Sequence, residues 1–340
     1  MKLSIIIPVY NPPKKIFEST MNSVLTQGYD DLEIILVDDG SKSEIANLID
    51  GYEKKFKKII AIHQVNGGEG KARNTGLANS SGDYILFCDA DDYLAPGWLS
   101  EGMKLAALYN ADIVTGKMEQ APKHPTDNKN IINSNHVYFE KKDLNIVQRD
   151  IFLEKTEILP NMKYIDAGAC AKIIKKSIIG NIRFYENYKL STDQIFNHMI
   201  ISKANSFVLS DHNSYYYLTN FNSISHQVNH EAVDLMMNAQ EIISKYLIDE
   251  SVIDSFLFHA IEDFQRAIHL SIFADDKKTY FCKRKELKAD LNRTIVKKAL
   301  DRINFNLYWS NHKKIRAIML KYRMIDVYIL SKYIYRKFKY

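Results

Sequence analysis

Three aspartates, Asp89, Asp91 and Asp92, follow directly on a short apolar segment at residues 84–88. Such a segment is typical of a buried parallel strand, and ligands bind just beyond the carboxyl ends of these strands. Carboxylates this close together raise one another's pKa unless a cation neutralises them. The pattern therefore indicates a divalent metal with hard oxygen ligands that holds a phosphorylated substrate. An acidic turn that begins the next helix, with Asp91 or Asp92 as its N-cap, would explain the same residues.

A second acidic pair, Asp38 and Asp39, follows another apolar segment at residues 32–37. The glycine-rich residues 66–70 then precede a helix start that carries Arg73. Backbone N–H groups at a helix start, together with a basic side chain, can hold phosphate, although many glycine-rich loops are only turns. Acids at the ends of two parallel strands converge on one edge of a sheet, and this convergence is more informative than either pair alone.

The hydrophobic pattern predicts the elements that position these residues. Short apolar segments alternate with stretches of helical periodicity, which predicts an α/β fold with a mostly parallel sheet flanked by helices. The predicted strands are residues 3–9, 32–37, 59–63 and 84–88, and the helices between them cover residues 15–26, a stretch that ends near 54, and 71–78.

The later part of the chain continues the α/β pattern and then changes. We expect helices at 98–110, 141–151 and 175–179 and one that begins near Asp193, strands at 112–117, 207–209 and 214–218, a strand within 166–174, and a surface loop at 119–136. From residue 230 onward long helices with few glycines or prolines follow, including 232–247 and 252–273. We therefore predict two domains, residues 1–228 and 229–340.

Charge and cysteine content exclude some classes of protein. The net charge of +5 is uneven, because residues 296–340 hold 12 Lys or Arg and two acids, so this tail is about +10 and the rest about −5. A chain-wide basic surface for nucleic acid is therefore not expected. The three cysteines are far apart and form neither a zinc motif nor a disulfide framework, which favours a reducing compartment.

The N-terminal segment and the hydropathy predict a cytoplasmic protein. The chain passes from Met1 directly into a strand-like segment without a small-residue cleavage pattern, so we expect mature structure there and no signal peptide. We find no uncharged apolar window of about 18 residues, so we expect no membrane span.

Four segments in order resemble the family 2 glycosyltransferases, nucleotide-sugar transferases with a GT-A fold, and in particular the bacterial polysaccharide and capsule type. They are SIIIPVYN at residues 4–11, VDDGS at 37–41, GKARNTG at 70–76 and FCDADD at 87–92. The resemblance implies a Rossmann-like, mostly parallel sheet with a C-terminal helical extension. It also divides the first domain into a nucleotide-sugar-binding half, 1–118, and an acceptor-binding half, 119–228.

The resemblance also implies roles for individual residues. Asp39 would accept from the uracil N3–H with Asp38 as its neighbour, and Arg73 would lie near the base or phosphates. Asp89 would lie towards the ribose, and Asp91 would bind a Mn²⁺ or Mg²⁺ that bridges the two phosphates, while Asp92 would orient the loop. The complete implied donor site is Pro8, Val9, Tyr10, Asn11, Asp38, Asp39, Arg73, Asp89, Ala90 and Asp91.

The general base is expected at Asp193. Family members usually carry a Glu-Asp pair at a helix start, in which the Asp deprotonates the acceptor hydroxyl, and here the pair is Thr192-Asp193. The departure from Glu leaves open that Asp193 is only a helix cap. His226 and His212 are candidates for an additional metal or phosphate contact, and Asp89 for a further metal contact; a lone histidine is more often structural.

These residues predict transfer of a sugar from a UDP-sugar to a hydroxyl of a glycan or lipid-linked acceptor, with inversion and with a divalent metal, in cell-surface polysaccharide synthesis. Two alternatives remain. A sugar nucleotidyltransferase also combines acids with a glycine-rich loop, but that loop follows the first strand, where this chain has Tyr10-Asn11-Pro12-Pro13. A catalytically inactive sugar-nucleotide-binding protein would explain Thr192.

The basic, tyrosine-rich residues 284–340 have two interpretations. Amphipathic basic helices can lie on an anionic membrane, which would place the protein on the inner face of the cell membrane and suit a lipid-linked acceptor. Alternatively these helices cap the catalytic domain or form an oligomer contact. No motif identifies the sugar, the acceptor or the oligomeric state.

Overall fold

The structure is a computed structural model that describes residues 1–121, 134–186, 188–218, 228–307 and 310–338. The chain forms two compact units. Unit 1 comprises Met1–Val147 and Glu154–Thr219, and unit 2 comprises Gln148–Leu153 and Asn220–Tyr340. The division of the chain into domains at residue 228 stays a prediction.

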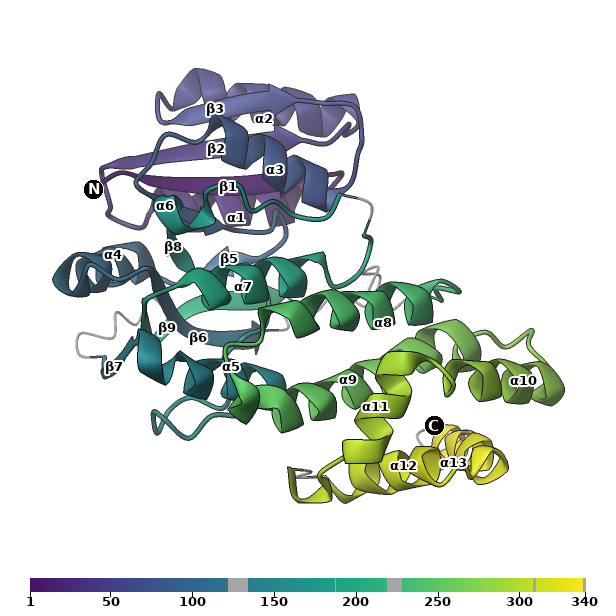
Figure 1. Cartoon of the computed structure of the whole chain (residues 1–340). Helices are drawn as coiled ribbons and strands as arrows, with labels where there is room; N and C mark the ends of the chain where they lie inside the picture. Colours follow the sequence, from purple (N-terminus) through teal and green to yellow (C-terminus); the bar gives the residue numbers. More distant parts are fainter. Residues whose placement is uncertain (122–133, 187, 219–227, 308–309, 339–340) are drawn as a thin grey trace. The chain divides into compact units, whose positions relative to one another are not determined.

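The first half of unit 1 is the predicted alternation of strands and helices (Figure 1). The strands pair in parallel in the order β3-β2-β1-β4, with Leu3 beside both Leu32 and Tyr84. The elements are β1 (Leu3–Val9), α1 (Lys14–Leu25), β2 (Leu32–Asp38), α2 (Ser43–Lys55), β3 (Ile59–His63), α3 (Glu69–Asn79) and β4 (Tyr84–Phe87). The predicted α/β fold is confirmed here.

The apolar strands of this half are buried on both faces, as expected for a parallel sheet covered by helices. Ile5, Ile6 and Ile7 are successive residues of β1 and all are 0% exposed. Gly76 lets α3 lie close to β1, because a Cβ at this position would be 2.3 Å from Cγ2 of Ile6. Helix α3 carries Arg73, so this close packing positions a candidate site residue.

The second half of unit 1 extends the same sheet with both kinds of pair: β6 and β9 pair in parallel, and the other added pairs are antiparallel. Across the residues that the structure describes, nine strands follow the order β3-β2-β1-β4-β8-β6-β9-β5, with β7 also paired to β9. The added elements are β5 (Tyr93–Leu94), α4 (Trp98–Tyr109), β6 (Ile113–Ala121), β7 (His136–Glu140), β8 (Ile173–Lys175), α6 (Lys176–Ile179), α7 (Thr192–Lys203) and β9 (Ser206–Leu218). Helix α5 (Leu144–Leu153) begins in unit 1 and continues into unit 2.

The prediction of two strands at 207–209 and 214–218 is wrong, because both belong to the single strand β9. Its polar centre resembled a turn, but Asp211 accepts from the backbone N–H of Asn135, and two register shifts against β6 absorb the irregularity. Strand β6 also continues to Ala121, into the predicted loop 119–136, of which residues 122–133 lie outside the described residues. Strands β5 and β7 were not predicted.

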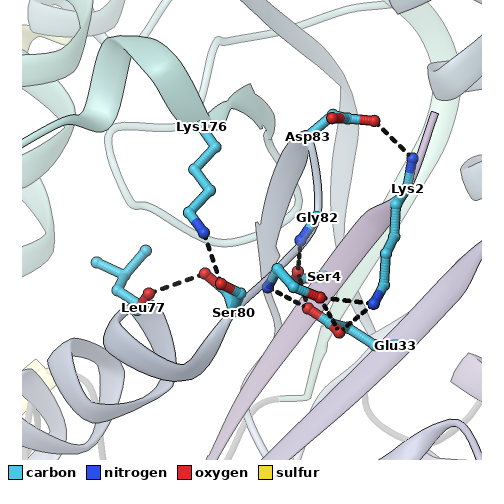
Figure 2. Close-up of polar contacts among 9 residues, drawn as sticks. Lys2, Ser4, Glu33, Leu77, Ser80, Gly82, Asp83 and Lys176 are labelled. Carbon is cyan, nitrogen blue, oxygen red and sulfur yellow. Dashed lines mark hydrogen bonds and ion pairs between the residues drawn. The ribbon is translucent and has the colours of Figure 1, made fainter.

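A polar cluster closes the amino edge of the parallel strands (Figure 2). Glu33 in β2 accepts from the Ser4 hydroxyl at 2.5 Å and forms an ion pair with Lys2 at 2.5 Å. The backbone N–H and the hydroxyl of Ser81 also donate to Glu33, at 2.5 and 2.6 Å. The Ser4 hydroxyl in turn accepts from Gly82 N at 2.8 Å. Glu33 is therefore a buried carboxylate whose acceptor sites are used by the chain itself.

Gly82 is required for this cluster to close. A Cβ at position 82 would be 2.6 Å from Oγ and 2.7 Å from N of Ser4, and 2.9 Å from the Lys2 carbonyl oxygen. Real Cβ atoms do not come this close to backbone atoms, so only glycine allows the segment before β4 to reach β1.

Unit 2 is helical in the residues that the structure describes, which confirms the predicted C-terminal helical extension. Its helices are α8 (Ala232–Ile243), α9 (Ile253–Ile268) with a π-helical continuation (His269–Phe273), α10 (Tyr280–Asp290), α11 (Thr294–Arg302), α12 (Asn311–Lys321) and α13 (Ile325–Phe338). Helix α9 contributes much of the hydrophobic core of this unit, and its Phe256, Ile261 and Phe264 are buried. No helix among the described residues is long and apolar enough to cross a membrane.

Candidate active site

The loops after β1 and β2 form the first part of the site, at the carboxyl edge of the sheet. Asp39 N donates to the Val9 carbonyl at 2.9 Å, which joins the two strand ends. Asn11 has a left-handed backbone with φ 49, donates from its N–H to the Ser41 hydroxyl at 3.1 Å and accepts from Lys42 N at 2.8 Å. Val9 is buried, Pro8 is partly exposed, and Tyr10 is 59% exposed. Tyr10 is thus the predicted base-pocket side chain that is most open to a ligand.

Asp38 and Asp39 are both buried but hold different parts of the chain. Asp38 accepts from Ser41 N at 2.7 Å and contacts Nδ1 of His63 at 2.7 Å, and this hydrogen bond raises the pKa of His63. Asp39 accepts from the Gln64 side chain at 2.7 Å and from the N–H groups of Gly67 and Gly68 at 2.9 and 2.8 Å.

Asp39 therefore shapes the glycine-rich loop that precedes α3. A carboxylate offers about four acceptor positions, so three bonds from the chain leave room for one further donor. That remaining capacity is what the predicted contact with a base N–H would use.

Arg73 is buried against acids and an aromatic ring. Its guanidinium donates to Asp89 at 2.8 Å, pairs with Glu69, and lies 5.2 Å from the centre of the Phe184 ring. Nε of Arg73 is buried, and no residue that the structure describes accepts from it. Arg73 and Asp89 are thus brought together as predicted for two residues of one site.

An aromatic cluster beneath Arg73 connects the strand that precedes the acids to helix α7. Phe184 and Phe196 stack at 4.0 Å between ring centres, and Phe87 contacts both rings edge-on at 5.1 and 5.6 Å. Asn74, next to Arg73, donates to the Phe184 carbonyl at 3.0 Å and accepts from Phe184 N at 2.9 Å. These contacts position both Arg73 and α7, which carries Asp193.

The loop of Asp89, Ala90 and Asp91 is held by its neighbours through backbone bonds. Asp89 N donates to the hydroxyl of Tyr215 at 2.9 Å, and the Ala90 carbonyl accepts from Thr20 at 3.1 Å. Asp92 is buried and accepts from Leu218 N at 2.9 Å, so it ties this loop to the end of β9. The carboxylates of Asp89 and Asp91 are not used in these bonds.

The electrostatics of this loop suit a cation. Burial raises the pKa of Asp91, and the Asp89 carboxylate raises it further. The same two causes raise the pKa of Asp92. A divalent cation would relieve this repulsion. In the described part of the chain no three acidic, histidine or cysteine side chains are grouped as metal ligands. Because Mg²⁺ usually binds one or two carboxylates together with substrate phosphates, the acids at 89 and 91 fit such a shared site.

Asp193 lies in the first turn of α7 without capping the helix. Ser191 is the N-cap residue, and no side chain caps the helix there. One oxygen of Asp193 accepts from the adjacent Gln194 N at 2.9 Å. Burial raises the pKa of Asp193, Arg73 partly offsets this, and the Asp166 carboxylate raises it further. Thr192, at the place of the expected Glu, is buried and donates to the Tyr185 carbonyl at 3.2 Å.

The structure adds a group of residues that sequence reasoning missed, Asp166, Gly168 and Lys172. A Cβ at Gly168 would be 2.8 Å from Oδ1 of Asp166 and 3.1 Å from Oδ2 of Asp193, so the absence of a side chain here leaves room for both carboxylates. Lys172 is 0% exposed, and its ammonium donates to the carbonyls of Asp166 and Gly168 at 2.9 and 2.5 Å. Burial lowers the pKa of Lys172, opposed first by Asp166. The sequence feature that could have indicated this group is Lys172, a charged residue in a segment of small and apolar residues.

Of the two histidine candidates, the structure describes only His212. His226 lies outside the described residues. His212 is buried, its Nδ1 contacts the Asn213 carbonyl at 2.6 Å, and its ring lies 6.1 Å from that of Trp98. These contacts give His212 a packing role in β9.

Comparison with known proteins identifies the family. The family model for glycosyl transferase family 2 matches residues 4–179. Glycosyltransferase GlyA of Streptococcus pneumoniae is 36% identical over 115 residues, which cover 34% of this chain and 16% of that protein. Poly(ribitol-phosphate) beta-glucosyltransferase of Bacillus spizizenii is 30% identical over 225 residues, 64% of this chain and 32% of that protein. The matched region thus spans less than a third of each of these two relatives.

A solved structure has the same fold over nearly the whole chain. It is the crystal structure of S. aureus TarS 1-349 in complex with UDP-GlcNAc, with a TM-score of 0.67 and 19% sequence identity. The similarity covers 99% of this chain and 92% of that one. This likeness supports the GT-A fold, which the sequence had predicted.

Proposed function

The chain belongs to glycosyl transferase family 2, and from this premise we propose that it transfers a sugar from a UDP-sugar to a hydroxyl of a glycan or lipid-linked acceptor, with inversion. The observation that supports this most is the position of Asp193 in the first turn of α7, where its carboxylate and that of Asp166 both lie next to Gly168 and where the charges of Arg73 and Asp89 act on it. A carboxylate with a raised pKa, beside a cationic and acidic cluster that suits a diphosphate, is what such a transfer requires.

In this proposal the strand ends bind the donor. Pro8, Val9, Tyr10 and Asn11 line the base pocket, and Asp39, supported by Asp38, accepts from the uracil N3–H through its remaining acceptor position. Arg73 stays charged beside Asp89 and compensates the negative charge of the phosphates, with its free Nε available to an oxygen of the donor. Asp89 lies towards the ribose, and the Ala90 backbone keeps the two acids on one side of the loop.

Asp193 acts as general base. It takes the proton from the acceptor hydroxyl as that oxygen attacks the anomeric carbon from the side opposite the leaving diphosphate. Burial and the Asp166 carboxylate, which raise the pKa of Asp193, make it a stronger base than an exposed aspartate. Lys172 donates to the carbonyls of Asp166 and Gly168 and so holds the backbone that carries the Asp166 carboxylate.

A Mn²⁺ or Mg²⁺ held by Asp91, with Asp89 or His226 as a further contact, would supply charge stabilisation for the departing diphosphate. Asp92 does not hold the cation in this proposal, because its carboxylate supports the backbone at Leu218.

The relatives support an acceptor in cell-surface polymer synthesis. The B. spizizenii relative is named a poly(ribitol-phosphate) beta-glucosyltransferase, and the TarS crystal structure holds UDP-GlcNAc. We therefore propose a hydroxyl of a cell-surface polysaccharide or of its lipid-linked precursor as the acceptor. The place of action is the cytoplasm at the inner face of the cell membrane, with residues 284–340 as the membrane contact.

Turnover of UDP-sugars tests the proposal. Thermal shift with UDP-glucose and UDP-N-acetylglucosamine, each with Mn²⁺ or Mg²⁺, selects the donor, and release of UDP with a polyol-phosphate or glycan acceptor measures transfer. The Asp193→Asn variant should lower kcat by about 10²- to 10⁴-fold and keep the donor-induced shift. Full turnover by this variant would disprove the base assignment. A donor-induced shift without UDP release in the wild type would favour the inactive binding protein.

A further inference from the structure

Helix α13 of unit 2 has apolar side chains on two opposite faces. Ile325, Tyr328 and Ile329 are buried and pack the helix onto its own unit. On the other side Val327, Leu330 and Ile334 are 43%, 57% and 50% exposed. These three follow the spacing i, i+3, i+7 of a single helical stripe, which we call the outer face. An amphipathic surface helix needs only one apolar face to pack onto its domain, and the exposed outer face is not part of the packing of unit 2.

The turn that precedes α13 extends the outer face. Tyr322, Arg323 and Met324 are all exposed, and Arg323 has a left-handed backbone with φ 52. This φ is uncommon for a residue with a Cβ, and here it places an aromatic, a basic and an apolar side chain in solvent next to the apolar stripe. Helices that lie in a lipid interface combine basic side chains with aromatic and aliphatic ones in this way.

The segment that carries the outer face has an excess of positive charge. Residues 311–340 contain nine Lys or Arg and one acid, Asp326. Asp326 is already paired with Arg284 at 2.8 Å and accepts from the Tyr280 hydroxyl at 2.5 Å. Lys313 of α12 pairs with Glu262 of α9 at 2.6 Å, but the sequence of this segment keeps a large excess of basic over acidic residues. Anionic lipids attract such a basic segment by about 1 kcal/mol per Lys or Arg near the surface.

Charge also decides between a lipid surface and a second copy of this chain as the occupant. A contact between two outer faces would bring together two segments that each carry an excess of positive charge, which like-charge repulsion opposes. An anionic lipid surface attracts the basic segment and accepts the apolar stripe at the same time. Helix α13 is too short and too basic to cross a bilayer, so it would lie along the interface.

We propose that the outer face of α13, Val327, Leu330 and Ile334, docks with the Tyr322–Met324 turn onto an anionic lipid surface. This narrows the membrane contact from residues 284–340 to one helix face, and it rests on the proposed membrane location but not on the proposed sugar transfer.

Flotation of the full chain with lipid vesicles tests the proposal. Wild-type protein should float with vesicles of phosphatidylcholine and phosphatidylglycerol, much less with phosphatidylcholine alone, and less when salt is added. The triple variant Val327→Ser, Leu330→Ser, Ile334→Ser should reduce the bound fraction by about tenfold or more, because interfacial binding follows the buried apolar area. The matched control is the double variant Val65→Ser, Leu108→Ser, which removes exposed apolar side chains from unit 1 and should float like wild type.

Three results would overturn the proposal: absence of wild-type flotation, equal binding to neutral and anionic vesicles, or equal flotation of the triple variant and wild type. A wild-type dimer in sedimentation velocity that the triple variant loses, without any vesicle binding, would assign the face to a second copy. Circular dichroism shows whether the triple variant is folded. UDP release with a soluble acceptor should be the same for wild type and the triple variant, which separates this test from that of sugar transfer.

Discussion

Glu33 and Asp91 are carboxylates at the two opposite edges of the parallel part of the sheet. Glu33 stands near the amino end of β2, and Asp91 follows the carboxyl end of β4. At the amino edge Lys2, Ser4 and Ser81 all donate to Glu33. At the carboxyl edge Asp91 has Asp89 as its charged neighbour.

The two edges shift the pKa of their carboxylates in opposite directions. At the amino edge burial alone would raise the pKa of Glu33, but the bonds from Lys2, Ser4 and Ser81 outweigh it and lower the pKa to about 2. At the carboxyl edge burial and nearby acids raise the pKa of Asp91 and of Asp193. The amino edge therefore stabilises the folded chain, whereas the carboxyl edge holds negative charge that Arg73 compensates only in part. Such uncompensated charge is typical of functional sites.

The largest expected effect comes from removing a carboxylate at the carboxyl edge. Asp91→Asn should lower metal-dependent turnover by about 10³-fold or more, because it removes the proposed cation ligand. Its melting temperature without metal should be equal to or above that of wild type, because one repelling charge is gone. The control is Asp83→Asn at the amino edge, which should keep turnover. A large loss of stability in Asp91→Asn would contradict the distinction between the edges.

Two glycines give a matched pair, one at each edge. Gly82→Ala should cost about 2–3 kcal/mol of unfolding free energy and leave kcat close to wild type, because the Cβ collides with the backbone of Lys2 and Ser4. Gly168→Ala should lower kcat by about 10- to 100-fold, because its Cβ displaces the carboxylates of Asp166 and Asp193. Urea unfolding and steady-state kinetics on both variants measure the two effects. If Gly82→Ala lost turnover and Gly168→Ala lost stability, the roles assigned to the two edges would be wrong.

Glu33→Gln should have a smaller effect on stability. It removes the ion pair with Lys2 and turns one acceptor oxygen into a donor that faces the hydroxyl and N–H groups of Ser4 and Ser81. The expected cost is about 2 kcal/mol in urea unfolding, with kcat unchanged. A variant as stable as wild type would show that the Glu33 cluster contributes nothing to folding.

The smallest and most reversible effect is on the pH dependence. Because the folded pKa of Glu33 is lowered to about 2 from 4.5, its stabilisation is present above pH 4.5 and is lost as the pH falls towards 2. Because the pKa of Asp193 is raised above 3.8, the base becomes protonated at a higher pH than an ordinary aspartate. On acidification the protein should therefore lose turnover while it is still folded, and regain it at neutral pH. Initial rates and circular dichroism over one pH series measure this, and coincident loss of both signals would contradict it.

Much of unit 1 could be predicted because its information is local. Strands such as 59–63 are apolar segments between turns, and the helices between them have a clear periodicity, so their types and approximate ends follow from neighbouring residues. The polar centre of β9 could not be predicted as strand, because Asp211 becomes compatible with a sheet only through its bonds to Asn135. Strand β5 has only two residues and takes its structure from pairing with β9.

The site could be predicted only where its residues form motifs. The acids at 38–39 and 89–92, Arg73 and Asp193 were all selected from the sequence, and their roles stay predictions. Asp166, Gly168 and Lys172 were missed because their relation to Asp193 depends on how α7 packs, through Phe184 and Phe196, onto the sheet. The Glu33 cluster was missed for a similar reason, since its partners lie 29 to 48 residues away in the chain.

The amino-edge cluster also has a consequence for the order of folding. Ser4 and Gly82 are 78 residues apart in the chain, and Lys2 and Asp83 are 81 apart. Contacts across such separations form late, because the entropy of closing the intervening loop must be overcome first. The first strand can therefore pair with β2 early, but Glu33 gains all its partners only after the segment before β4 has arrived. A chain interrupted before residue 81 would bury Glu33 with part of its bonds missing, so the first three strands alone are a poor folding unit.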